Sequence, residues 1–217
     1  MTSKIKTYLI YGTFLMCLLL GIMACSSDQT SNLSLQPGDS ACTSFNCWDG
    51  IVPGSTTLLE AQTLLETRHG EQNVILNRYN IEWETGSRSE YRGGSLRFDE
   101  QGVIYDITIG FSNNQLTVAE LISRIGEPSF VWVAVAFSSE SRCAGVIIAY
   151  PYVGVFAILF PEGDSVGIHP AQSIQGVTLL PLDEAEDWTS TDHWLLEWQG
   201  YGDYCELTRN ETPHAPY

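Results

Sequence analysis

The sequence predicts an α+β fold built from two tandem units, each a helix followed by an antiparallel sheet, with the helices packed on one face of the sheet. Two capping boxes predict the helix starts: Thr57 with Glu60, and Thr117 with Glu120. At this spacing the two side chains satisfy backbone N–H groups that the first helical turn leaves unpaired. An apolar stripe at helical spacing follows each box, and strand-like segments follow each stripe.

The second helix has the clearer pattern. Its stripe is Val118, Leu121, Ile122 and Ile125, and Gly126 and Pro128 end it. The first helix carries Leu58, Ala61 and Leu65 and ends at Gly70. We therefore expect a first helix-sheet unit over residues 42–115 and a second over residues 116–182.

Strands are expected where apolar and β-branched residues alternate or cluster between turn signals. The expected segments are 73–77, 79–84, 93–98, 103–111, 130–137, 145–150, 155–160 and 174–182. Segment 103–111 alternates most regularly, with Val103, Tyr105, Ile107, Ile109 and Phe111 on one face. Residues 183–217 are expected to form an acidic loop, at 183–187, and an aromatic C-terminal tail.

The N-terminus predicts export and a lipid anchor. Lys4 and Lys6 precede an apolar run that ends in small residues, the pattern of a signal peptide over residues 1–24. The run Leu20-Gly21-Ile22-Met23-Ala24-Cys25 resembles a bacterial lipoprotein signal, which implies cleavage before Cys25 and lipid attachment there. An uncleaved membrane-spanning helix is the alternative. Residues 25–41 are polar and without periodicity, as in a flexible tether.

Composition excludes several partners and mechanisms. The 217 residues carry a formal charge of −16, and Lys4 and Lys6 are the only lysines. Without them the chain carries about −18, so binding to nucleic acid or to an anionic membrane surface is unfavourable. A processed chain without lysine also cannot use Schiff-base or Ser-Lys chemistry.

Four cysteines remain after the signal and the lipid site: Cys42, Cys47, Cys143 and Cys205. An even number in an exported domain predicts disulfides, and three pairings are open. The short separation favours Cys42 with Cys47, which leaves Cys143 with Cys205. Zinc binding is the alternative, but the spacing is poor for it.

No sequence motif indicates an enzyme. Nucleophile elbows, phosphate loops and His-Glu-x-x-His patterns are absent, and His69, His169, His193 and His214 are scattered. Residues 183–187 lack the alternating ligands of a calcium loop, so a solvated charge run is expected there. We expect no cofactor and no metal site.

The aromatic tail is the candidate binding surface, because clustered Trp and Tyr side chains anchor many interfaces. Its residues are Trp188, Trp194, Trp198, Tyr201 and Tyr204. The alternative is that the tail belongs to the core, since Trp194, Leu195 and Trp198 lie at helical spacing.

Two short patterns carry family resemblances. Leu116 to Pro128, a turn followed by Thr-x-x-Glu, an apolar helix and Gly-x-Pro, resembles the helix-to-sheet entry in small lipoproteins of the outer-membrane β-barrel assembly machine. A tandem pair of such units also resembles the β-lactamase inhibitory protein, which implies one continuous curved sheet with helices on one side. Residues 47–57 and 125–128 are similar to a set of uncharacterised bacterial lipoproteins, which implies no known activity.

We therefore expect an extracytoplasmic lipoprotein, anchored to the bacterial cell membrane or to an outer membrane, that acts as a non-enzymatic binding or assembly module with a protein partner in the cell envelope. One alternative is an inhibitor or sensor that docks a secreted enzyme or ligand on the sheet. Another is a hydrolase with a carboxylate pair such as Asp203 and Glu206.

Overall fold

The computed structural model describes residues 42, 44–85, 91–111, 116–134, 145–160, 167–191, 195–204 and 206–207. The chain divides into two units, residues 1–32 and 33–217, and every described residue belongs to the second. The expected signal peptide, the tether and the lipid site at Cys25 therefore lie outside the described residues. None of the described helices is both long enough and apolar enough to cross a membrane.

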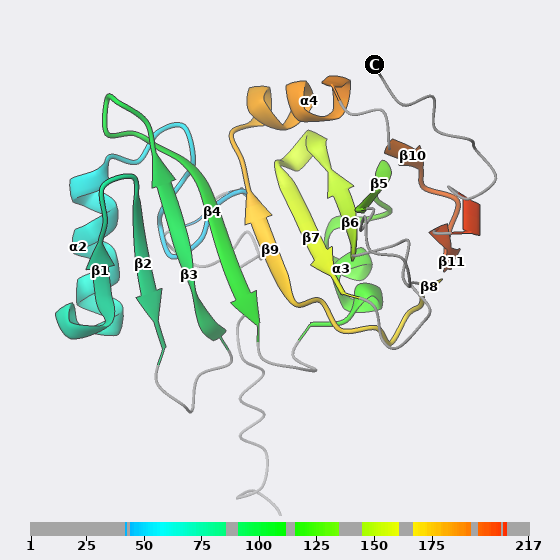
Figure 1. The fold of residues 1–217 in the computed structure, drawn as a ribbon, viewed down its shortest axis with the longest axis horizontal. Helices are drawn as coiled ribbons and strands as arrows, with labels where there is room; N and C mark the ends of the chain where they lie inside the picture. Colours follow the sequence, from blue (N-terminus) through cyan, green and yellow to red (C-terminus); the bar gives the residue numbers. More distant parts are fainter. Residues whose placement is uncertain are drawn as a thin grey trace, which may run out of the picture. The chain divides into compact units, whose positions relative to one another are not determined.

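A nine-stranded antiparallel sheet organises the fold (Figure 1). Its order is β1-β2-β3-β4-β9-β7-β6-β5-β10. The strands are β1 (Val74–Leu76), β2 (Asn80–Glu84), β3 (Tyr91–Phe98), β4 (Ile104–Phe111), β5 (Phe130–Ala134), β6 (Gly145–Tyr150), β7 (Val155–Leu159), β9 (Gly176–Leu179) and β10 (Leu195–Glu197). A separate pair joins β8 (Gly167–Ile168) to β11 (Gly202–Asp203). The α+β class is confirmed.

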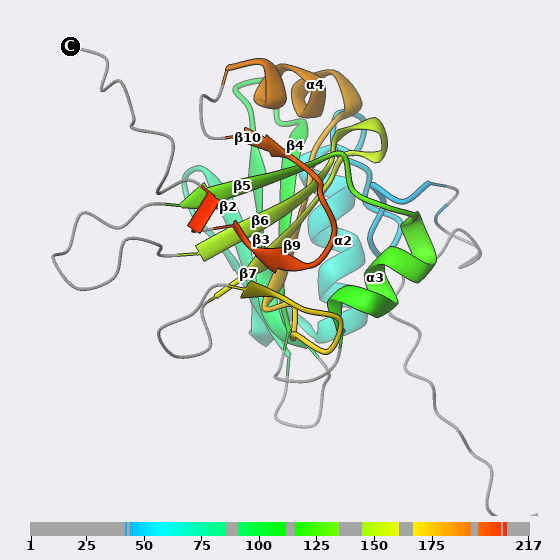
Figure 2. The same cartoon turned by 90° about the vertical axis from the view of Figure 1, so that its right-hand side faces the viewer.

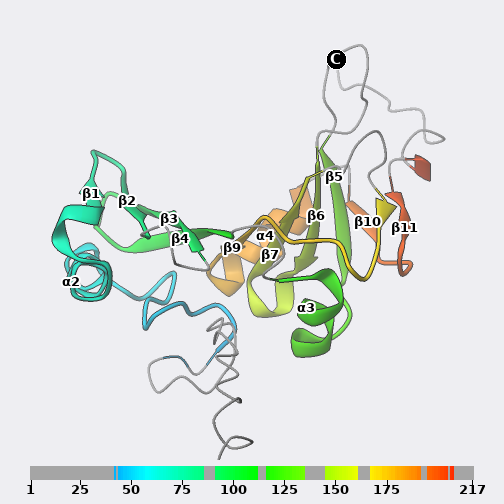
Figure 3. The ribbon, with the colours of Figure 1, turned by 90° about the horizontal axis from the view of Figure 1, so that it is seen from below.

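Helices α2 (Leu58–His69) and α3 (Val118–Ile125) lie on the same side of the sheet (Figure 3). Their buried residues, which include Leu65 and Leu121, share one apolar core with inward-facing strand residues such as Ile81 and Val131. Each helix begins with the expected capping box, in which the N-cap threonine accepts from the Glu N–H and the Glu carboxylate accepts from the threonine N–H. The residue at which each helix begins is therefore set by side chains within its own first turn, as the sequence predicts.

Helix α4 (Leu182–Thr191) replaces the acidic loop expected at residues 183–187. It lies across one end of the strands (Figure 2). Ala185 is fully buried in a second cluster with Ala149 and Phe156, whereas the neighbouring Ile148 belongs to the main core. Because successive strand residues point to opposite faces, α4 covers the face opposite α3. The loop prediction was wrong because acidic side chains in a first helical turn interact favourably with the helix dipole.

The sheet differs from the expected arrangement in three places. The two expected units do not have separate sheets: their strands form one sheet, which is what the resemblance to the β-lactamase inhibitory protein implies, because β9 pairs with β4 as well as with β7. The tail contributes an edge strand, β10, where helical spacing was noted. In β4, Ile104 is fully buried and Tyr105 is not, since a register shift between β3 and β4 at Arg97 and Phe98 interrupts the regular alternation.

Candidate functional site

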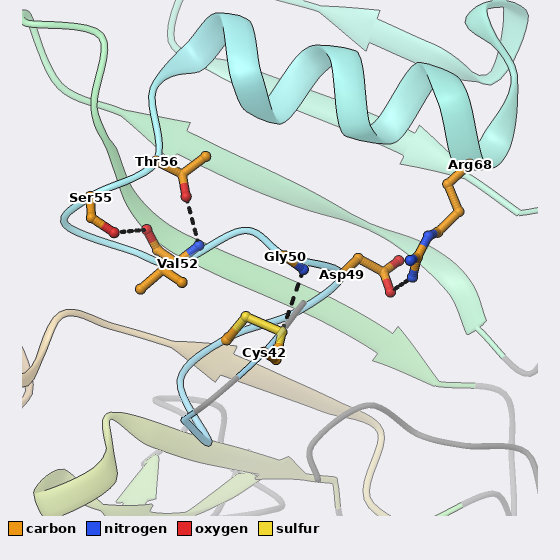
Figure 4. Close-up of a disulfide and its surroundings, with 8 residues drawn as sticks. Cys42, Asp49, Gly50, Val52, Ser55, Thr56 and Arg68 are labelled. Atoms are coloured by element: carbon orange, nitrogen blue, oxygen red, sulfur yellow. Dashed lines mark hydrogen bonds and ion pairs between the residues drawn. A yellow bond between two sulfur atoms is a disulfide. The ribbon is translucent and has the colours of Figure 1, made fainter. Parts of the chain in front are cut away.

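The segment before α2 is a compact, heavily hydrogen-bonded loop (Figure 4). The sulfur atoms of Cys42 and Cys47 lie at disulfide distance, 2.01 Å, which is the pairing that the sequence favours. Trp48 and Ile51 then exchange two backbone hydrogen bonds, of 3.0 and 2.8 Å, across a tight turn. Asp49 sits in that turn with φ 54°, a conformation that Asp adopts more readily than most residues. The disulfide and the turn hold the chain in one path.

The loop continues as a second turn that leads into the helix. The N–H of Val52 donates to Oγ1 of Thr56 over 2.8 Å, and the carbonyl of Val52 accepts from the N–H of Thr56 over 3.0 Å. The N–H of Gly54 donates to the carbonyl of Ile104 in β4, and the N–H of Ile104 donates to the carbonyl of Thr56. The loop is therefore fixed to the sheet as well as to itself.

Helix α2 carries apolar side chains on two sides. Ala61 and Leu65 face the core and are at most 1% exposed. Leu59 is 74% exposed and Leu64 is 38% exposed. These two leucines lie off the stripe that defines the buried face, and that offset is the signal in the sequence that could have revealed a second apolar side.

An open groove of about 690 Å³ runs between α2 and the loop, and we call it the α2 groove. It is lined by Gly50, Val52, Ser55, Thr56, Leu59, Glu60, Thr63 and Leu64. Val52, Leu59 and Leu64 supply apolar surface, and Ser55, Thr56 and Thr63 supply hydroxyl groups. Because the loop is fixed and the helix is capped, the α2 groove is largely preformed, as small-molecule and peptide sites commonly are.

Among the described residues that line the α2 groove, Glu60 is the charged one. Its Oε2 accepts from the N–H and from Oγ1 of Thr57, over 2.9 and 2.8 Å. These hydrogen bonds, the backbone one foremost, hold the pKa of Glu60 below its ordinary value. The α2 groove therefore carries a negative charge at neutral pH.

A polar cluster lies where the last turn of α2 meets the loop. Arg68 Nη1 pairs with Asp49 Oδ1, and His69 Nε2 lies 3.9 Å from Asp49 Oδ2 (Figure 4 labels the first pair). The His69 ring stacks on Trp48, with centroids 5.9 Å apart and planes 3° apart. Burial, and secondarily the charge of Arg68, lowers the pKa of His69, so the ring is neutral at pH 7. His69 is thus a packed ring within the cluster, outside the lining of the α2 groove.

The described part of the tail divides between two places. Trp188, on α4, packs against Phe156 and Trp132, with ring centroids 4.7 and 6.0 Å away. Trp198 stacks on Tyr204, which is 1% exposed, and meets the 46% exposed Tyr201 edge to face. Trp188 and Tyr204 are therefore packed against the rest of the fold, as the core alternative expects. Among the described aromatic residues of the tail, Tyr201 is the exposed one.

Several expected site residues lie outside the described residues: Cys25, Cys143, Trp194 and Cys205. Of the hydrolase candidates, Asp203 ends β11 and Glu206 follows three residues later. The N–H of Glu206 donates to Asp203 Oδ1 over 3.2 Å. In the described part of the chain, no group of three or more His, Cys, Asp and Glu residues is placed to hold a metal ion.

Comparisons with known proteins add one distant likeness. No family model matches the chain, and no curated protein matches it. Among solved structures, it is similar to a DUF4309 family protein (YjgB) from Bacillus subtilis. The identity is 13% and the TM-score 0.39, over 60% of this chain and 82% of that one.

Proposed function

We propose that this protein is an extracytoplasmic, lipid-anchored binding module that presents the α2 groove to a protein partner and catalyses no reaction. The anchor is inferred from the N-terminal sequence, where the apolar run ends at Ala24 and Cys25. The tether at residues 25–41 would carry the folded part away from the lipid headgroups, which repel its acidic surface.

The observation that carries the proposal is that Leu59 and Leu64 both line the α2 groove and are both exposed. A single exposed leucine is ordinary on a protein surface, but two that line the same groove, together with Val52 of the fixed loop, give that groove apolar surface which a partner can cover. Covering such a surface releases about 25 cal/mol per Å² of apolar area, so a partner that fills the groove gains affinity there. The capped helix and the hydrogen-bonded loop lower the entropic cost of binding, because little has to be ordered.

Photo-cross-linking in the native bacterium tests the site. A photoreactive amino acid at Leu59 is expected to capture a discrete envelope protein. The same amino acid at Leu182 is the matched control, because that leucine is 49% exposed on α4. Capture of the same protein from both positions, or capture from neither, would refute the α2 groove as the binding site.

The anchor needs its own test. The wild-type chain should partition into the detergent phase and yield a mature N-terminus at Cys25 that bears lipid by mass spectrometry. A Cys25→Ala variant should lose the lipid, whereas Cys17→Ala, a change within the predicted signal peptide, should leave the lipid in place. An intact signal peptide on the wild-type protein would contradict the anchor.

The open sheet face favours a second candidate, an inhibitor or sensor. Helix α4 packs against β6 and β7 through Ala149 and Phe156, whereas the exposed Glu82 and Arg97 lie on β2 and β3. A partner bound there would be captured by a photoreactive group at Glu82 and not by one at Leu59.

We also propose that the two halves are tandem copies of one unit. Each helix is followed by four strands of the large sheet, and the last strands of the two sets, β4 and β9, are neighbours. The helix entries make equivalent backbone hydrogen bonds: Leu58 to Gly102 and Ile104 to Thr56 in one half, Val118 to Gln172 and Ile174 to Leu116 in the other. Significant matching of the two halves over their full length in related sequences would support the duplication, and matching limited to the helix starts would refute it.

A further inference from the structure

We infer that the occupant of the α2 groove is a basic, amphipathic polypeptide segment, with aliphatic side chains against Leu59 and Leu64 and Lys or Arg side chains beside Glu60. This inference rests on the proposed function, since it names the partner chemistry of the same site. It follows from the distribution of charge around the groove.

The charged groups at the entry of α2 are acidic. Glu60 lies in the lining, and its lowered pKa keeps it ionised. The turn that joins β3 to β4 carries the exposed Asp99 and Glu100 and lies beside the first turn of α2, because the N–H of Leu58 donates to the carbonyl of Gly102 over 2.7 Å. A cationic side chain in the α2 groove would be attracted by Glu60 in the lining, and the charges of the adjacent turn would add to that attraction.

Neighbouring arginines are occupied elsewhere. Arg68 pairs with Asp49 at the far end of α2, and Arg97 pairs with Asp106 on the sheet. The guanidinium of Arg78 lies 4.9 Å from the centroid of the Tyr79 ring. The acidic character of the helix entry is thus not neutralised by these three side chains.

An anionic ligand does not fit the helix N-terminus. Such ligands bind through free N–H groups of the first turn. Here the N–H groups of Thr57, Leu58 and Glu60 donate to Glu60 Oε2, to the Gly102 carbonyl and to Thr57 Oγ1. The Glu60 carboxylate also opposes an incoming anion.

The charge balance excludes a second copy of the chain as the favoured occupant. A processed chain carries about −18, so two copies repel each other. The open form of the groove disfavours a small ligand, which usually buries most of its surface in its site. A polypeptide segment can instead extend along the groove and keep its polar side in water, as amphipathic helices do.

Peptide binding to the full lipidated protein in non-ionic detergent micelles tests the inference. Three fluorescent peptides of about four helical turns are compared by anisotropy, with empty micelles as the blank. One is amphipathic with Leu and Lys, one amphipathic with Leu and Glu, and one polar with Ser and Lys. We expect the Leu/Lys peptide to bind at least about tenfold more tightly than either of the others, and its affinity to fall with added salt.

Substitutions in the α2 groove test whether the peptide binds there. Leu59→Ser and Leu64→Ser, which change the two exposed leucines, should each lower the affinity for the Leu/Lys peptide several-fold. The double variant should lower it about tenfold or more. Leu182→Ser is the control and should change nothing. Glu60→Gln keeps a capping-box acceptor and should weaken binding about twofold to fivefold.

Two results would overturn the inference: equal or tighter binding of the Leu/Glu peptide, or Leu/Lys binding that Leu59→Ser and Leu64→Ser leave unchanged. If cross-linking at Leu59 still captures a partner in either case, the groove is a binding site and only the partner chemistry is wrong. If that cross-link is also absent, the proposed function fails with it.

Discussion

Arg68, in the last turn of α2, pairs with Asp49, in the turn that follows the disulfide, and so ties the end of α2 to the loop. The Asp49 side chain is 10% exposed and the Arg68 side chain is 47% exposed. The Asp49 carboxylate is largely removed from water, so its charge is stabilised mainly by Arg68. The Arg68 guanidinium, in contrast, is still well solvated.

Arg68→Ala should lower the free energy of unfolding by roughly 1–2 kcal/mol, less than for a fully buried pair, because water screens Arg68. Asp49→Asn should cost less, since Asn tolerates positive φ and keeps an acceptor. Denaturant unfolding of both variants and of the double variant measures the coupling. Strict additivity of the two effects would show that the pair contributes nothing.

The two capping boxes should contribute equally to stability. Thr57→Ala and Thr117→Ala each remove the acceptor for a first-turn N–H and should lower the free energy of unfolding by about 1 kcal/mol. Thr63→Ala is the matched control within α2, because Thr63 is exposed in the helix interior, where Ala is the better helix former. A loss at Thr63 as large as that at Thr57 would contradict a specific capping effect.

Two buried tyrosines should respond in opposite ways to loss of the hydroxyl. Tyr204 Oη accepts from the N–H of Gln199 and donates to the carbonyl of Gly200, each over 2.8 Å, so Tyr204→Phe should lower the free energy of unfolding by about 1–3 kcal/mol. Tyr150 Oη has no hydrogen-bond partner among the described residues, and burial raises its pKa. Tyr150→Phe should leave stability unchanged or raise it by up to about 1 kcal/mol. Thermal or denaturant unfolding of the two variants decides between these outcomes.

Stability should fall as the pH drops below 6.5 because of His69. Its folded-state pKa lies below its ordinary value of 6.5, so the unfolded chain takes up the proton first and acidification favours unfolding. The loss begins near pH 6.5 and is complete below the lowered pKa. Wild type and His69→Gln are compared by denaturant unfolding at several pH values, and identical pH profiles would refute the assignment.

Gly94 should tolerate no side chain. A Cβ atom at this position would collide with the Trp83 ring and with the Thr108 carbonyl on the two neighbouring strands. Gly94→Ala should therefore lower the free energy of unfolding by about 3 kcal/mol or more. Gly202→Ala is the control, since nothing lies within 4 Å of a Cβ atom there. A stable Gly94→Ala protein would show that the Trp83 ring can move aside.

Local chemistry made several parts of the fold predictable. Thr57 and Thr117 mark the starts of the two helices in the sequence, and Gly70 and Gly126 mark their ends. Most strands begin and end within a few residues of their expected bounds. These features depend on neighbours within a few positions, which the sequence displays directly. The α2 groove was not predicted, because whether Leu59 is covered depends on where the loop and the sheet lie.

Sequence by itself determined the α+β class, the two capped helices and the acidic charge, since each follows from spacing or composition, and it favoured Cys42 with Cys47 among three open pairings. Tertiary structure alone decided that β9 pairs with β4 to make one sheet, that residues 183–187 begin a helix packed through Ala185, and that Leu59 and Leu64 stay exposed. The physical reason is that strand partners, helix docking and solvent exposure arise between segments that are far apart in the chain, so no local pattern encodes them.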